Sequence, residues 1–175
     1  MNNFVCYLKK KEELLFFLLN RTLVYSPLAV VMHIFTFFGS AAFAVGLCLF
    51  ALFFSFDFFL YLASAVIVCQ IIVQTLKRIF TRQRPCHALT EVLFKKSPPL
   101  NSYSFPSGHT STAFSIALTC MIFFPAFTWL FYLTAVFVGI SRIVLGVHYP
   151  TDVVIGAVLG FFSHVLSVIL LSMIL

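Results

Sequence analysis

Three short polar clusters in this sequence contain residue types that could carry out chemistry on a phosphate group. The first cluster is residues 77–85, with the sequence KRIFTRQRP. Its Lys77 and Arg84 are seven residues apart, about two helical turns, so both side chains can project from one side of a helix. These cations could neutralise phosphate oxygens, or they could form a row that snorkels to lipid headgroups.

The second cluster is residues 106–109, with the sequence PSGH, directly before an apolar run. Proline, serine and glycine at this place predict a helix start, where free backbone N–H groups and the positive end of the helix dipole favour an anion. Gly108 permits close approach of the backbone, and the Ser107 hydroxyl can donate a hydrogen bond. A plain helix cap would need no histidine, so His109 favours a phosphate site over a cap.

The third cluster contains Ser141-Arg142, then His148, then Asp152. Arg142 lies near the end of an apolar segment, where an unpartnered charge is costly. Asp152 follows His148 by four residues across a Tyr149-Pro150 turn, so its carboxylate can accept the ring N–H. That contact would fix the tautomer and make the other ring nitrogen a better nucleophile, although such a pair can also be purely structural. Together with the first two clusters, the chain has cations and helix-start N–H groups to bind phosphate oxygens and two histidines to act as nucleophile and acid. These are the groups that phosphoryl transfer requires.

The spacing of these clusters, K-x6-RP, then PSGH, then SR-x5-H-x3-D, resembles the signature of the type 2 phosphatidic acid phosphatase (PAP2) superfamily. Every signature position is present and in order in this sequence. Members of that family include bacterial lipid phosphatases, glucose-6-phosphatase and vanadium haloperoxidases. The haloperoxidases are soluble, so the resemblance implies a phosphatase for a chain as apolar as this one.

The resemblance also implies a role for each matched residue. His148 would attack phosphorus and form a phosphohistidine, Asp152 would orient it, and His109 would protonate the leaving oxygen and later activate water. The groups that would hold the phosphate oxygens are Lys77, Arg84, Ser107, the Gly108 N–H and Arg142. No metal and no cofactor are implied. Contacts with the rest of a headgroup are expected from the loop residues His87, Glu91, Lys95 and Lys96.

Similar small bacterial members act on the 1-phosphate of lipid A, on undecaprenyl pyrophosphate or on phosphatidylglycerol phosphate. Of these activities, lipid A 1-phosphatase is the one we expect. Two readings from other classes stay open at the level of sequence. A lipid-to-lipid phosphotransferase would use the same site with a different acceptor. A non-catalytic membrane protein that binds anionic lipid would keep the cations but would have no use for His109, His148 and Asp152.

Composition places these clusters in a membrane protein. Of the 175 residues, 62% are hydrophobic and only 9% are charged, whereas soluble domains carry about 25% charged residues. The formal net charge of +6 could indicate nucleic acid, anionic lipid or a phosphorylated substrate. We expect no nucleic acid for so apolar a chain; the expected partners are the bilayer and a phosphorylated lipid, and no protein partner is implied.

The elements that must position the clusters are apolar segments of membrane-spanning length, which is about 20 residues. They cover residues 28–54, 58–80, 109–124, 127–147 and 153–175. Residues 4–25 mix charged and apolar side chains, which is typical of an amphipathic helix in the membrane interface. We therefore expect an all-α membrane bundle of about five transmembrane helices plus an N-terminal interfacial helix. The expected organisation is a single domain, 1–175, with the interfacial helix at 4–25, the bundle at 28–175 and catalytic motifs at 77–85, 106–109 and 141–152.

Five spans would bring all three clusters to one face of the membrane. All 11 Lys and Arg lie on or near that face, as suits an anion-binding site. The positive-inside rule would put this face in the cytoplasm, whereas the family resemblance puts the site on the periplasmic face of the bacterial inner membrane. Because several of these cations would serve the substrate, the expectation follows the resemblance.

Overall fold

The computed structural model describes residues 3–93 and 103–174, and every regular element in these two ranges is helical. The all-α expectation is therefore confirmed. In chain order the elements are α1 (Asn3–Leu23), α2 (Leu28–Phe37), α3 (Ala41–Phe54), α4 (Phe56–Phe80), α5 (Pro85–Ala88), α6 (Gly108–Phe123), the 3-10 helix η1 (Pro125–Phe127), α7 (Thr128–Val144) and α8 (Pro150–Ser172).

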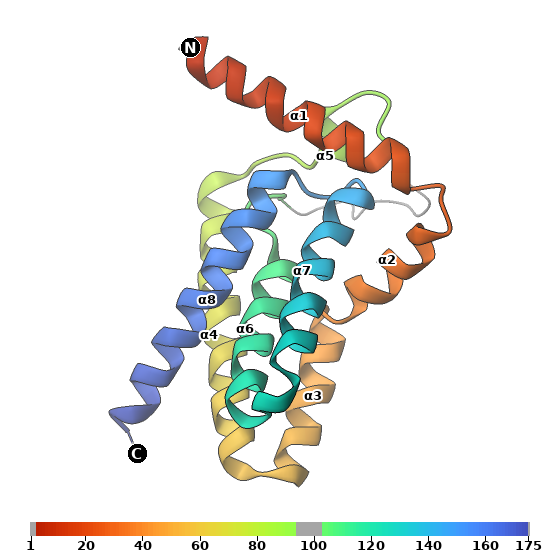
Figure 1. Cartoon of the computed structure of the whole chain (residues 1–175). Coiled ribbons are helices and arrows are strands. Elements are labelled where there is room, and N and C mark those ends of the chain that lie inside the picture. The colour runs from red at the N-terminus through yellow and green to blue at the C-terminus, as the bar shows by residue number, and fades with distance from the viewer. Residues whose placement is uncertain (1–2, 94–102, 175) are drawn as a thin grey trace.

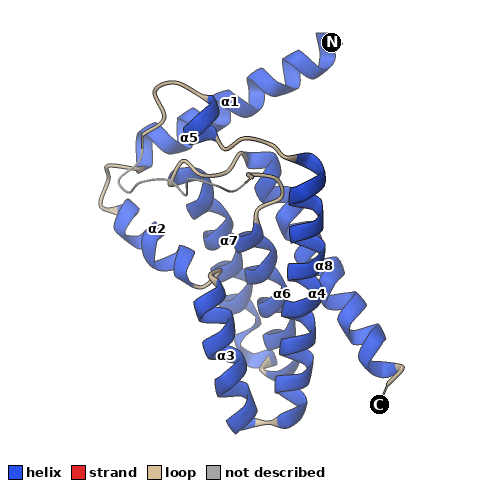
Figure 2. Ribbon diagram, turned by 180° about the vertical axis from the view of Figure 1, so that it is seen from behind, coloured by secondary structure: helices blue, strands red, loops and turns tan. Residues whose placement is uncertain are grey.

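Helix α6 is the centre of the bundle and packs against α4, α7 and α8, while α3 packs against α4. Figure 1 shows α1 lying across one end of this bundle, beside α5 and close to the start of α8, whereas the α3–α4 turn and the C-terminus lie at the opposite end. The view from behind in Figure 2 shows the same arrangement. The three polar clusters therefore gather at the end that α1 covers, as the one-sided charge distribution predicts.

Three helical stretches in the described residues are long and apolar enough to cross a membrane: Phe56–Ala88, Pro125–Val144 and Pro150–Ser172. Helices α1 and α2 pass the same test only as a pair bent by 113°. Helix α3 has 14 residues and α6 has 16, which is short for a span of about 20 residues. The chain is a multi-pass membrane protein, and the interfacial position expected for residues 4–25 stays a prediction.

The expectation of one continuous span over residues 28–54 is wrong, because two helices, α2 and α3, replace it. The break lies at Gly39 and Ser40, and the Ser40 hydroxyl caps α3 by accepting a hydrogen bond from the Phe43 N–H at 3.1 Å. A Cβ on Gly39 would lie 2.5 Å from the His109 carbonyl oxygen. Only glycine therefore lets the broken segment approach the start of α6 so closely.

Small residues join α8 to α6, as the Gly156 and Gly160 spacing predicts. A Cβ on Gly156 would lie 2.8 Å from the Ser107 oxygen, and one on Gly160 would lie 2.5 Å from the Ser111 oxygen. The two backbones thus meet closely along α6. Since Ser107 and Ser111 belong to the first part of α6, this packing fixes the second polar cluster against the helix that carries Asp152.

Candidate active site

A cavity of about 260 Å³ lies where the three polar clusters meet. Segments distant in sequence contribute to it: the end of α4, the start of α6, the turn between α7 and α8, and the break between α2 and α3. The residues that line it are Gly39, Ala41, Gln70, Gln74, Lys77, Arg84, Gly108, His109, Thr112 and His148. Five predicted site residues are therefore brought to one cavity, namely Lys77, Arg84, Gly108, His109 and His148.

His148 is almost fully buried in the turn between α7 and α8, with an exposed fraction of 1%. Its backbone N–H donates to the Arg142 carbonyl at 3.2 Å. Arg84 Nη1 lies 3.2 Å from His148 Nε2 and donates to the Val147 carbonyl at 3.0 Å. A guanidinium can only donate, so Nε2 is the acceptor and the proton of the neutral ring sits on Nδ1. This tautomer leaves the lone pair on Nε2, the nitrogen beside the Arg84 guanidinium.

The Asp152 carboxylate faces the other side of the imidazole. Its Oδ2 lies 3.5 Å from His148 Nδ1, and within the described residues Nδ1 has no closer hydrogen-bond partner. Asp152 is the third residue of α8, where Oδ2 also accepts from the Tyr149 N–H at 2.9 Å. At 3.5 Å the contact is longer than an ordinary N–H···O hydrogen bond, so the carboxylate faces Nδ1 without bonding it. The orienting role of Asp152 stays a prediction.

Burial lowers the pKa of His148 well below its ordinary value, and the cations Arg142, Arg84 and Lys77 lower it further. The imidazole is thus neutral near pH 7, which is the protonation state that a nucleophile needs.

His109 lines the cavity from the first turn of α6, where its backbone contacts the break at Gly39. Gly108 precedes it, and a Cβ there would lie 4.0 Å from Lys77 Cε. Lys77 Nζ donates to the Tyr103 carbonyl at 2.7 Å. The positive end of α6 and the Lys77 ammonium therefore face the same small space, which suits an anion.

Ser107 and Arg142 lie behind the cavity wall. The Ser107 hydroxyl is buried and shares a hydrogen bond with Thr110 Oγ1 at 2.8 Å, while its N–H donates to the Asp152 carbonyl at 3.0 Å. Arg142 Nη1 donates to Thr36 Oγ1. In the part of the chain that the structure describes, Arg142 Nε is buried without a hydrogen-bond partner. Direct phosphate contacts by these two residues stay predictions, and both tie neighbouring elements to the site.

Of the four expected headgroup residues the structure describes two, His87 and Glu91, and neither of these lines the cavity. Lys95 and Lys96 lie outside the described residues. His87 is exposed on α5, and Glu91 forms an exposed ion pair with Arg21 of α1. Their contact with a headgroup stays a prediction, and for Glu91 the structure provides a different partner.

Sequence reasoning missed two glutamines of the cavity wall. Gln74 and Gln70 stand one and two turns before Lys77 on the same side of α4, and Gln70 Nε2 donates to Thr112 Oγ1 at 2.8 Å. Their spacing of four and three residues along an otherwise apolar helix was the available signal.

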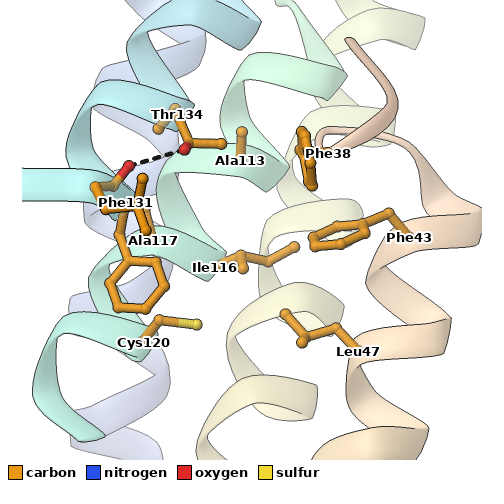
Figure 3. A pocket seen from close by; sticks show the side chains of 11 residues that line it. Phe38, Phe43, Leu47, Ala113, Ile116, Ala117, Cys120, Phe131 and Thr134 are labelled. Atoms are coloured by element: carbon orange, nitrogen blue, oxygen red, sulfur yellow. Dashed lines mark hydrogen bonds between the residues drawn. The ribbon is translucent and has the colours of Figure 1, made fainter. Parts of the chain in front are cut away.

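A second cavity, of about 290 Å³, lies between α3, α6 and α7 (Figure 3). Its lining is almost wholly apolar: Phe38, Phe43, Leu47, Ala113, Ile116, Ala117, Cys120, Leu130, Phe131, Thr134 and Ala135. Phe38 and Phe43 flank the Gly39 and Ala41 positions of the polar cavity, and Ala113 follows Thr112. The apolar cavity therefore lies further along α6 than the polar one, on the side away from the start of that helix.

Comparison with known proteins identifies relatives of this chain. The model of the PAP2 superfamily matches residues 55–174, which include all three polar clusters. A lipid A 1-phosphatase from Rhizobium etli is 31% identical over 112 residues, which cover 62% of this chain and 48% of the relative. The chain thus spans about half the length of that curated relative.

Two solved structures resemble the whole fold. LpxE from Aquifex aeolicus is 32% identical, with a TM-score of 0.77 over 88% of this chain and 92% of that one. A transmembrane PAP2-type phosphatidylglycerolphosphate phosphatase from Bacillus subtilis is 27% identical, with a TM-score of 0.72 over 95% of this chain and 85% of that one. The likeness therefore extends beyond the three clusters to the helices that position them.

Proposed function

The chain belongs to the PAP2 superfamily, and on that premise we propose that it is a membrane lipid phosphatase that removes the 1-phosphate of lipid A through a phosphohistidine intermediate. The observation that carries this proposal is the contact of Arg84 Nη1 with His148 Nε2 at the wall of the cavity. It makes Nε2 the unprotonated nitrogen and puts that nitrogen next to a cation able to bind the phosphate to be attacked.

In the first step, His148 Nε2 attacks phosphorus and forms an N–P bond while the bond from phosphorus to the lipid oxygen breaks. Burial and the neighbouring cations lower the pKa of His109 in the free protein, whereas a bound phosphate, as an anion, raises it again. His109 therefore takes up a proton when the substrate binds and gives that proton to the leaving oxygen. The developing negative charge on the phosphoryl oxygens is stabilised by Lys77 and Arg84 at the cavity wall, with Arg142 behind it. The positive charge that the imidazole gains is balanced by Asp152, 3.5 Å from Nδ1.

In the second step, His109, now neutral, takes a proton from water. The water oxygen attacks phosphorus, the N–P bond breaks, and inorganic phosphate leaves with His148 neutral again. The same residue thus acts first as acid and then as base, which returns the enzyme to its starting protonation state.

Two features support a lipid rather than a soluble phosphate ester. An apolar cavity lies between α3, α6 and α7, further along α6 than the polar cavity, and could receive part of a hydrocarbon chain (Figure 3). The chain is also a multi-pass membrane protein whose site lies at one end of the bundle. The names of the Rhizobium etli relative and of the Bacillus subtilis phosphatase support lipid A 1-phosphate and, as a second candidate, phosphatidylglycerol phosphate; undecaprenyl pyrophosphate completes the set to be tested.

The test is release of inorganic phosphate by the purified protein from each of these three lipids, with a chelator present. We expect release with lipid A as the best substrate and none by His148→Ala. Equal phosphate release by the wild type and His148→Ala would contradict the assignment of His148 as the nucleophile. No release from any lipid would favour a non-catalytic lipid-binding protein. Adding an unphosphorylated acceptor lipid separates hydrolysis from phosphotransfer, because transfer would yield a newly phosphorylated lipid in place of free phosphate.

We also propose that the protein lies in the inner membrane of a bacterium with its site on the periplasmic face. Thr90 follows α5 on the site face and is exposed, so Thr90→Cys in a Cys6→Ser background offers a reporter thiol. A membrane-impermeant maleimide should label it in intact spheroplasts. Labelling only after lysis would put the site on the cytoplasmic face.

A further inference from the structure

A chain of charged contacts runs from α1 to the partner of the nucleophile. Arg82 follows the end of α4, and its guanidinium lies between two carboxylates. Nη2 donates to Glu12 Oε2 at 2.7 Å, and Nη1 donates to Asp152 Oδ1 at 2.9 Å. Asp152 is the residue whose other oxygen faces His148. Glu12 is therefore connected to the nucleophile through two side chains.

Further contacts restrict the orientation of Arg82. Its guanidinium carbon lies 3.9 Å from the centre of the Tyr149 ring, and Nη1 also donates to Thr151 Oγ1 at 2.9 Å. Glu12 Oε1 in turn accepts from the Thr151 N–H at 3.2 Å and from the Thr151 hydroxyl. The side chains of Glu12 and Asp152 are only 11% and 0% exposed, so these charged contacts are screened little by water.

One stripe of α1 holds Glu12 in this place. Phe16 and Asn20 follow Glu12 at intervals of four residues, Val24 comes four residues later, directly after the helix, and all three are fully buried. Asn20 Nδ2 donates to the Val144 carbonyl at the end of α7, and the Phe16 ring lies 5.9 Å from the Tyr149 ring. Side chains on the opposite side of α1 are exposed, as Leu14 and Leu18 are. The stripe thus fixes the rotation of α1 about its axis and points Glu12 at Arg82.

We propose that Glu12 and Arg82 are positioning residues that hold the Asp152 carboxylate in the orientation that orders His148. This inference rests on the proposed phosphatase function. Neither residue lines the cavity, so neither is placed to touch the phosphate. Because Arg82 divides its two terminal nitrogens between two carboxylates, loss of Glu12 frees the guanidinium to turn, and Asp152 then loses a fixed donor on Oδ1. The nucleophile loses its orientation while the phosphate site stays intact.

The experiment compares Glu12→Gln with Glu13→Gln. Glu13 is the neighbouring carboxylate, and its ion pair is a long one with Lys9 on the same helix, 4.0 Å away. We expect Glu12→Gln to lower kcat on the order of tenfold, in line with the sensitivity of catalysis to small displacements, with KM changed less than twofold. Glu13→Gln should match the wild type, and Glu12→Asp should regain part of the lost kcat.

A double-mutant cycle tests whether Glu12 acts through Arg82. Arg82→Gln should lower kcat more than Glu12→Gln does, and the double variant should be no slower than Arg82→Gln alone. If the kcat of the double variant instead fell by the product of the two single losses, Glu12 would not act through Arg82 and the proposal would be overturned. The proposal would also be overturned by equal kcat for Glu12→Gln and Glu13→Gln, by a rise in KM alone, or by a fall in kcat that follows a fall in the thermal midpoint across the variants. A wild type that releases no phosphate overturns the proposed function and this inference with it, whereas an active wild type with unaffected variants overturns only this inference.

Discussion

At the scale of single residues, the reactivity of His148 depends on two neighbours with opposite charges. Arg84 donates to Nε2 and disfavours a proton there, whereas Asp152 lies 3.5 Å from Nδ1 and favours a proton at that nitrogen. The ring is buried, so both influences act in a medium of low polarity. A neutral nucleophile of defined tautomer follows from these contacts.

An experiment that traps the phosphorylated protein should distinguish the role of His109 from that of His148. With an aryl phosphate, whose leaving group needs little protonation, His109→Gln should still form the N–P bond but should hydrolyse it slowly, since the base for water is missing. We expect acid-labile, alkali-stable label on the protein from a substrate labelled with radioactive phosphate, and at least about tenfold slower turnover. His148→Gln is the control and should remain unlabelled; label on that variant would move the nucleophile elsewhere.

The lowered pKa of His148 also predicts how stability depends on pH. The unfolded chain takes up a proton at this residue as the pH falls through about 6.5, whereas the folded protein does not until the pH is much lower. Folded-state stability therefore falls on acidification below about 6.5. His148→Gln should lose less stability than the wild type between pH 7 and pH 5 when thermal midpoints are measured in detergent. Parallel curves would mean that the buried ring contributes nothing.

At the scale of elements, the break between α2 and α3 brings a fourth side to a site that α4, α6 and the α7–α8 turn would otherwise leave open. Gly39 and Ala41 line the polar cavity from that break, and the His109 carbonyl lies against Gly39. A straight helix over the same residues could not cap α3 with Ser40 at this point. The irregularity of the segment is therefore part of the site.

Replacement by alanine should have opposite effects on stability at two glycines of this region, Gly39 and Gly46. A Cβ on Gly39 would lie 2.5 Å from the His109 oxygen, so Gly39→Ala must displace the start of α6. We expect a loss of about 1–3 kcal/mol of stability, as overpacking costs, together with lower kcat. Gly46 lies within α3 with nothing within 4 Å of a Cβ; Gly46→Ala should be neutral or slightly stabilising. Thermal midpoints and kcat of both variants provide the check, and equal behaviour would contradict the close approach.

The sequence predicted the elements that carry the three clusters better than it predicted what lies around them. Helices α4, α6, α7 and α8 follow the expected apolar segments because long apolar runs admit few alternatives in a membrane. The break at Gly39 was not predicted, since the clash that requires it comes from α6, far along the chain. The contact of Glu12 with Arg82 was missed for the same reason: 70 residues separate them, and no local pattern reports such a contact.

At the scale of the whole molecule, charge and apolar volume are arranged along one axis. The polar cavity lies at the end that α1 covers, and the apolar cavity of about 290 Å³ follows it deeper between α3, α6 and α7. Far from the site, aromatic rings such as Phe58 and Phe123, with centroids 4.9 Å apart, pack the opposite end. A phosphorylated lipid has the same order of parts, with a charged group followed by a hydrocarbon chain.

If part of the lipid chain occupies the apolar cavity, filling that cavity should discriminate between substrates by chain length. Among the α6 residues that line it, Ala113 is the one nearest to the start of the helix, so Ala113→Leu reduces the space at the end of this cavity closest to the polar site. We expect kcat/KM for a long-chain lipid phosphate to fall about tenfold relative to that for a short-chain analogue, since a few lost methylene contacts are worth about 0.8 kcal/mol each. Ala157→Leu is the matched control, because Ala157 lines a different apolar cavity, of about 280 Å³, between α6, α7 and α8. An unchanged ratio of the two substrates in Ala113→Leu, or the same change in Ala157→Leu, would show that the chain of the lipid lies elsewhere and that only its phosphate is bound by this part of the bundle.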